Sequence, residues 1–182
     1  MSILTLRHGC SLAAAILTAS LILASPACNR HRVTVQTEEE GPTLATVVQV
    51  ADPHAAVQLL SGFYGVEQNS WRWTAGKFSV VLRPPRTAAV KGATLQLKFT
   101  VPDVVIAKLK ALSLAASVNG TPLNPESYTQ AGEFTYSRDV PASLLASESA
   151  KVDFSLDKTM PPTAGDQREL GVVVSTVGLD PK

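Results

Sequence analysis

The residues best suited to contact a ligand gather in the segment 62–78, GFYGVEQNSWRWTAGKF. This segment holds five of the ten aromatic residues of the chain: Phe63, Tyr64, Trp71, Trp73 and Phe78. Aromatic faces can stack on the apolar faces of sugar rings, since such side chains combine a large apolar body with a polar edge. The charged side chains of Glu67 and Arg72 could hold sugar hydroxyls beside them. The segment therefore indicates a cofactor-free platform for a glycan.

The same residues also have a structural interpretation. Trp73 would then fill the core, and Arg72 would pair with Glu67 at a strand end, because a buried charge needs a partner. We expect Trp73 in the core. The sequence leaves Tyr64 and Trp71 open between the core and a binding surface.

A second cluster lies near the C-terminus, where PPTAGDQRELGVVVSTVGL occupies 161–179. Asp166 and Arg168 are two residues apart, so Asp166 can cap a turn while Arg168 reaches another carboxylate, with Glu67 as one candidate. These two residues would either form part of the ligand-binding surface or hold the last strand in place through a structural ion pair. The candidate ligand-binding residues are Tyr64, Glu67, Trp71, Arg72, Trp73, Asp166 and Arg168.

Motifs for enzymatic chemistry are absent from the sequence. It has no G-x-S-x-G nucleophile elbow, phosphate-binding G-x-x-x-x-G-K or dinucleotide-binding G-x-G-x-x-G. His54 beside Asp52 could form an acid–base or metal pair, but we interpret the two as turn residues with an exposed imidazole. The sequence does not show which acids would meet across a sugar. We predict no enzyme, no catalytic residue, no cofactor and no metal site.

The N-terminus has the form of an export signal. Arg7 precedes an uncharged run of 14 residues, 11–24, which is shorter than the ~20 apolar residues that span a bilayer. Small residues at Ser25 and Ala27 fit signal cleavage before Cys28. We predict a signal peptide over 1–27.

Cys28 would be the only cysteine of the mature chain, because Cys10 lies in the removed segment. The segment resembles a bacterial lipoprotein signal, which implies a diacylglyceryl thioether on Cys28 and attachment to a membrane at the periplasmic face of the cell envelope. Ser25 departs from that pattern, which usually has Leu there. The alternative is a soluble secreted or periplasmic protein.

The segment 28–43 is polar and charged, and we predict a flexible tether. Its run Glu38–Glu40 could suggest metal binding but fits a solvated spacer better. Lys plus Arg number 16 and Asp plus Glu 15, and removal of the signal takes Arg7 and no acid, which leaves 15 against 15. Such a balanced chain has no electrostatic footprint for nucleic acid.

Short β-rich runs separated by turn residues fill the rest of the chain. In 93–101, for example, Leu95 and Leu97 alternate with polar neighbours such as Gln96. The predicted strands are 44–50, 55–60, 77–82, 93–101, 112–118, 133–138, 150–156 and 171–179.

The turn signals complete the prediction of fold. Asn119-Gly120 is typical of a tight hairpin, and the chain's 12 prolines disfavour long helices. The run 104–114 could be a short helix or a loop that enters a strand. Strands without a βαβ rhythm predict one all-β domain over 44–182, a two-sheet antiparallel β-sandwich that is jelly-roll-like.

Four segments in series carry a resemblance over about 60–180: GFYGVE, RWTAGKFSVVL, VNG, and PP-x-x-GD-x-R-x-LGVVVSTVGL. This series resembles the β-sandwich module of uncharacterised bacterial exported proteins, which is also appended to membrane glycosyltransferases. The chain departs from it at Phe63, where Trp is frequent, and at Val66, where Pro is frequent. The resemblance implies an all-β domain in cell-envelope polysaccharide work, without known catalytic residues.

Two hypotheses follow from the sequence. In the first, the protein is a noncatalytic envelope lipoprotein whose sandwich binds an envelope polysaccharide or a glycan-assembly protein. In the second, it is a structural or protein-interaction module, and both clusters are determinants of the fold. An enzyme ranks third, because carboxylates would be its only candidate catalytic groups.

Overall fold

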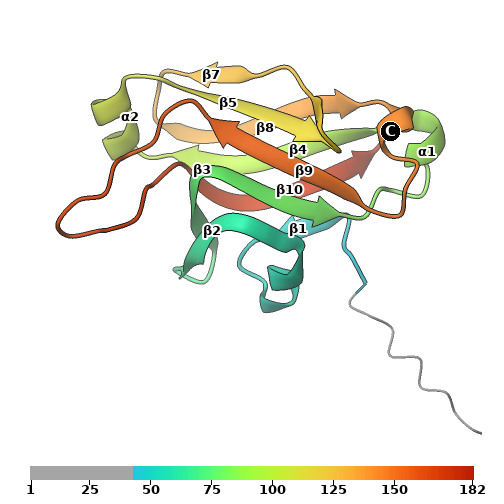
Figure 1. Ribbon diagram of the computed structural model, residues 1–182, viewed down its shortest axis with the longest axis horizontal. Coiled ribbons are helices and arrows are strands. Elements are labelled where there is room, and N and C mark those ends of the chain that lie inside the picture. The colour runs from blue at the N-terminus through green and yellow to red at the C-terminus, as the bar shows by residue number, and fades with distance from the viewer. Residues whose placement is uncertain (1–42) are drawn as a thin grey trace, which may run out of the picture. The chain divides into compact units, whose positions relative to one another are not determined.

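The computed structural model describes residues 43–182, and Figure 1 shows their arrangement. The predicted signal peptide, Cys28 and all but the last residue of the predicted tether lie outside the described residues. The ten strands are β1 Val47–Gln49, β2 Leu59–Glu67, β3 Trp71–Leu82, β4 Ala93–Val101, β5 Leu112–Val118, β6 Thr121–Pro122, β7 Glu126–Tyr128, β8 Gly132–Val140, β9 Ala150–Leu156 and β10 Val173–Pro181. The helices are the 3-10 helices η1 Pro53–Gln58 and η2 Ala142–Leu144 and the α-helices α1 Ala88–Lys91 and α2 Asp103–Leu109.

The strands form an antiparallel β-sandwich, as the sequence predicts. The first sheet runs β8-β4-β10, and both β1 and the start of β3 pair with the far edge of β10. The second sheet runs from β6 and β7 through β5 and β9 to the end of β3. The two sheets overlap in projection in Figure 1, with α2 and α1 at opposite ends. None of the described helices has the length and apolar character needed to cross a bilayer.

Strand β3 belongs to both sheets. Its first residues pair with β10, where Trp73 faces Val173, and its second half, 77–82, pairs with β9. Strand β2 runs along the opposite edge of β3, with Glu67 facing Trp71 and Leu59 facing Val80. The β2–β3 hairpin therefore connects the two layers.

The core lies between the sheets and follows the period-two pattern. In β4 the apolar residues Leu95, Leu97 and Phe99 are buried, and in β5 the same holds for Leu112 and Leu114. Side chains of successive strand residues point to opposite faces, so the polar residues between them lie on the outer faces.

Arg138 of β8 connects the edge of the first sheet to the segment that leads into β7 of the second sheet. Its guanidinium donates to the Asn124 carbonyl at 2.7 Å and to Glu126 Oε2 at 2.8 Å. The Tyr136 hydroxyl donates to the same Asn124 carbonyl at 2.8 Å. Burial raises the pKa values of Tyr128 and Tyr136, because an apolar environment disfavours the phenolate.

Several segments depart from or refine the predicted elements: β3 begins at Trp71 rather than at 77, and β6 and β7 lie where no strand is predicted. The predicted strand 55–60 is wrong, because Pro53–Gln58 forms the helix η1 and β2 begins at Leu59. Asp52 caps that helix by accepting from His54 N at 2.8 Å, and Pro53 suits its first turn. The ambiguous run 104–114 divides into helix α2, which ends at Leu109, and strand β5.

Two hairpin turns have both central residues at positive φ. Asn119 and Gly120, at 49° and 83°, make the predicted turn between β5 and β6. Gln68 and Asn69, at 49° and 54°, make the turn between β2 and β3, where Ser70 N donates to the Glu67 carbonyl at 3.1 Å. No glycine marks this second turn in the sequence.

Gly62 supplies the first prediction. Its φ is +75°, and a methyl group at this position would overlap the Lys77 carbonyl oxygen and stand 2.6 Å from Phe78 Cα. The variant Gly62→Ala should lose more than about 2 kcal/mol of unfolding free energy, because backbone strain adds to the overlap. Urea unfolding followed by tryptophan fluorescence measures the loss.

Gly65→Ala is the matched control in the same strand, since a methyl group there meets nothing within 4 Å. Its free energy of unfolding should stay within about 0.5 kcal/mol of wild type. Equal effects of the two variants would contradict the described path of β2 across β3.

Candidate functional site

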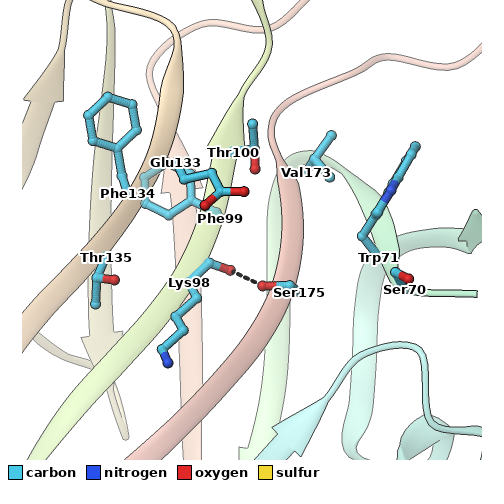
Figure 2. A pocket seen from close by; sticks show the side chains of 10 residues that line it. All are labelled: Ser70, Trp71, Lys98, Phe99, Thr100, Glu133, Phe134, Thr135, Val173 and Ser175. Atoms are coloured by element: carbon cyan, nitrogen blue, oxygen red, sulfur yellow. Dashed lines mark hydrogen bonds between the residues drawn. The ribbon is translucent and has the colours of Figure 1, made fainter. Parts of the chain in front are cut away.

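A groove of about 520 Å³ lies on the outer face of the first sheet. Figure 2 shows β8, β4 and β10 across its floor, with Trp71 on the β3 side. Phe134 borders the groove on the β8 side, but it pairs with the buried Phe99 and packs against Tyr128 of the second sheet. The groove is lined by Ser70, Trp71, Lys98, Phe99, Thr100, Glu133, Phe134, Thr135, Val173 and Ser175.

The strand register places the polar residues of the groove in rows. Thr100 pairs with Glu133 of β8 and with Val173 of β10, and the next row holds Lys98 and Thr135. The buried Phe99 separates these rows along β4, so Lys98 and Thr100 share the outer face. A polar floor made by three strands is therefore a direct result of the alternation in β4 and its neighbours.

Trp71 forms the aromatic side of the groove. It is half-buried and stands edge-on to Trp73, with ring centroids 6.4 Å apart and planes at 84°. Trp73 is also half-buried and packs against the core residues, so it contacts the core without filling it as predicted. Trp73 thus supports Trp71, whose indole lines the groove.

The groove offers hydrogen-bonding groups of several kinds. Ser175 Oγ donates to the Lys98 carbonyl at 3.3 Å, as the dashed line in Figure 2 marks. Within residues 43–182, neither the Lys98 ammonium nor the Glu133 carboxylate takes part in an ion pair. Hydroxyls, one ammonium, one carboxylate and one indole can contact a neutral ligand rich in hydroxyl groups.

Four of the predicted site residues form a separate group, which we call the Arg168 cluster: Tyr64, Glu67, Asp166 and Arg168. Arg168 Nη1 lies 2.8 Å from Glu67 Oε1, and Arg168 Nη2 lies 2.7 Å from Asp166 Oδ2. Arg168 Cζ stands 5.3 Å from the centroid of the Tyr64 ring. The predicted reach of Arg168 to Glu67 is confirmed.

This cluster attaches the segment between β9 and β10 to the β2–β3 hairpin. The Tyr64 hydroxyl donates to the Glu169 carbonyl at 2.8 Å, a contact between residues far apart in sequence. Hydrogen bonds from the Arg168 guanidinium, and from its backbone N–H, lower the pKa of Asp166 to about 2. The Asp166 and Glu67 carboxylates raise the pKa of Arg168 in turn. These contacts occupy the charged groups with partners inside the domain.

Arg72 is likewise occupied by the fold. Its Nε donates to the Val50 carbonyl at 2.6 Å and its Nη1 to the Tyr64 carbonyl at 2.8 Å. The predicted alternative of an Arg72–Glu67 pair is wrong, because Glu67 pairs with Arg168. Arg72 therefore ties the hairpin to the end of the β1 segment.

The structure divides the seven predicted residues among three places. Trp71 lines the groove with Trp73 behind it, Arg72 binds backbone carbonyls, and the remaining four form the Arg168 cluster. Sequence reasoning did not assign Lys98, Thr100 or Glu133 to a site. The available signal was the set of outward-facing polar residues that alternate with the buried ones along β4. It did not show which strands would lie beside β4.

The described residues hold no group of three or more His, Cys, Asp or Glu side chains placed to ligate one metal ion. Asp52 and His54 occupy the first turn of η1, and both are exposed. Their geometry fits the interpretation of the pair as turn residues.

No protein-family model matches the chain, and no curated protein matches it. Among solved structures, it is similar to an acetyl xylan esterase from the rumen bacterium Butyrivibrio proteoclasticus, with 12% identity and a TM-score of 0.46 over 75% of this chain and 32% of that one. The chain thus corresponds to about a third of the esterase.

Two other similar structures are carbohydrate-binding modules. One is the CBM36-1 domain of a multidomain xylanase from the hindgut metagenome of Trinervitermes trinervoides, with 12% identity and a TM-score of 0.44 over 75% of this chain and 97% of that one. The other is a family 35 module from an environmental isolate, with 12% identity and a TM-score of 0.37 over 79% and 90%.

The Arg168 cluster predicts a dependence of stability on pH. Because the pKa of Asp166 falls from an ordinary value of about 3.9 to about 2 on folding, its contribution is complete above about pH 4 and is lost as the pH falls towards 2. Asp166→Asn should therefore lower the thermal midpoint at pH 6 and have a diminishing effect between pH 4 and pH 2. Thermal unfolding of both proteins across pH 2–7 measures this gap.

Asp103→Asn, at an exposed acid in the first turn of α2, is the control. Its midpoint should stay close to wild type over the range. A gap between wild type and Asp166→Asn that remains constant down to pH 2 would mean that the Asp166 contacts do not depend on its charge.

Proposed function

We propose that the domain is a noncatalytic module that binds a glycan in the groove beside Trp71. The observation that supports this most is the position of Trp71 beside a polar floor of three strands. A sugar ring has apolar faces and a polar rim. An indole on one side and hydroxyl, ammonium and carboxylate groups below match these two surfaces.

The groups of the groove support binding more than catalysis. Glu133 is the only carboxylate among its ten lining residues, whereas glycoside hydrolysis in most families uses two carboxyl groups on either side of the bond. The lining residues contain no histidine or cysteine to activate a nucleophile. Binding of a neutral, hydroxyl-rich glycan without any reaction is the function that fits these groups.

We also propose that the module works at the cell envelope, attached to a membrane through a lipid on Cys28. The support is the sequence alone, in which Cys28 directly follows the predicted signal peptide and is the one cysteine of the predicted mature chain. A tether over 28–43 would then hold the domain near envelope polysaccharides.

An array of purified bacterial envelope polysaccharides tests the glycan proposal. Wild type should bind at least one of them, and Trp71→Ala should bind it at least about tenfold more weakly, which corresponds to about 1.4 kcal/mol. Trp71→Phe should recover part of the affinity, because it retains an aromatic face. Affinities are measured by titration calorimetry.

Ser117→Ala is the control, because Ser117 lies on the second sheet, away from the groove. It should bind like wild type, and all three variants should keep the circular dichroism spectrum of the wild type. No binding to any polysaccharide of the array, or equal binding by wild type and Trp71→Ala, would reject the proposal.

Mass spectrometry of the mature N-terminus tests the anchor. Expression of the full chain in a bacterium with a lipoprotein pathway should give a protein that begins at Cys28 and carries a diacylglyceryl group. Cys28→Ser should abolish that mass increase and release the protein from membranes. An unmodified Cys28 in the wild type would show a soluble exported protein instead.

A further inference from the structure

A second hollow, of about 130 Å³, lies on the same face of the first sheet as the groove. It is lined by Val47, Gln49, Gln96, Lys98, Thr176, Gly178 and Asp180. Lys98 also lines the groove. The shared side chain makes the two hollows neighbours on one surface.

The strand register shows that the two hollows lie one after the other along the direction of the strands. Along β10, Val173 of the groove pairs with Thr100, and Gly178 of the second hollow pairs with Gln96. On β4 these rows are four residues apart, which is roughly 13 Å at 3.3–3.4 Å per residue, and β10 covers the same length with five residues because of a bulge between Val174 and Thr176. The joined surface is therefore longer than a single sugar ring.

The second hollow presents three neutral hydrogen-bonding side chains, Gln49, Gln96 and Thr176, besides the charged Lys98 and Asp180. Thr176 Oγ1 donates to Gln49 Oε1 at 2.8 Å, which leaves the Gln49 amide NH₂ as a donor. The Gln96 amide forms no side-chain hydrogen bond with another residue in 43–182. Amides and hydroxyls of this kind both donate and accept, as the hydroxyls of a neutral sugar require.

We infer that the groove and the second hollow are two subsites of one glycan-binding surface, joined at Lys98, for several consecutive sugars of a linear neutral glycan. The inference rests on the glycan-binding function proposed above. Trp71 stacks on one sugar in the groove, and Gln49 and Gln96 hold the hydroxyls of a later sugar. Lys98 bonds to hydroxyls at the junction.

Chain length distinguishes this arrangement from a single subsite. The array polysaccharide that wild type binds most tightly is partly hydrolysed, and the fragments of two to eight sugars are separated by length. Wild-type affinity should rise with length until the fragment covers both hollows and should then remain level. Titration calorimetry gives the dissociation constant for each length.

The double variant Gln49→Ala/Gln96→Ala removes the second subsite and leaves the groove. It should bind the shortest fragments like wild type and the longest ones about tenfold more weakly. Trp71→Ala should weaken binding at every length. Ser113→Ala/Ser117→Ala, two polar truncations on the second sheet, should change none of these affinities.

Two results would overturn the second subsite while glycan binding itself stands. One is an affinity that is already at its maximum with two sugars. The other is a double variant that matches wild type at every length, or is weakened equally at every length, while it keeps the wild-type thermal midpoint. Failure of every array polysaccharide to bind wild type would instead reject the proposed function.

Discussion

The shared membership of β3 in both sheets is the constraint on which the rest of the described structure depends. Its first residues pair with β10 and its second half with β9, so one strand sets the position of the first sheet relative to the second. Strand β2 follows β3 along its other edge and needs Gly62 where the two backbones approach closely. A change in the path of β3 would therefore disturb the core, the hairpin and the groove together.

The Arg168 cluster has its role within this arrangement. The segment between β9 and β10 must return to β3, and Thr74 N donates to the Val172 carbonyl at 2.9 Å while Gly171 N donates to the Thr74 carbonyl at 2.7 Å. Arg168 fastens the same segment from outside through Glu67 on β2. Half-exposed ion pairs contribute modestly to stability, so we interpret the cluster as a device that fixes the position of this segment.

Sequence patterns predicted the strands that have strict alternation, because alternation directly reflects one buried and one exposed face. The ranges 93–101, 112–118 and 150–156 agree with β4, β5 and β9. The range 55–60 failed because Asp52 and Pro53 start a helix there, a local effect that outweighs the apolar composition. The turn at Gln68 and Asn69 has no glycine to reveal it.

The candidate site was harder to predict than the fold, because it depends on neighbours that are distant in sequence. The pairing of Arg168 with Glu67 could be predicted from the sequence, because the two residues have opposite charges and each lies in a cluster of candidate site residues. Lys98 and Glu133 could not, because their common surface exists only after β4 has paired with β8 in one register. A shift of one residue in that pairing would turn Glu133 towards the core.

The membership of β3 in both sheets also explains why the proposed glycan surface lies on the first sheet and not on the second. The outer face of the second sheet carries small side chains such as Ala115, Ser117 and Ser155, and its hollow has no half-exposed tryptophan. Small side chains leave little area to stack on a sugar ring. Because the start of β3 pairs with β10, Trp71 comes to the first sheet. The strand that connects the layers thus also decides which face has an aromatic platform.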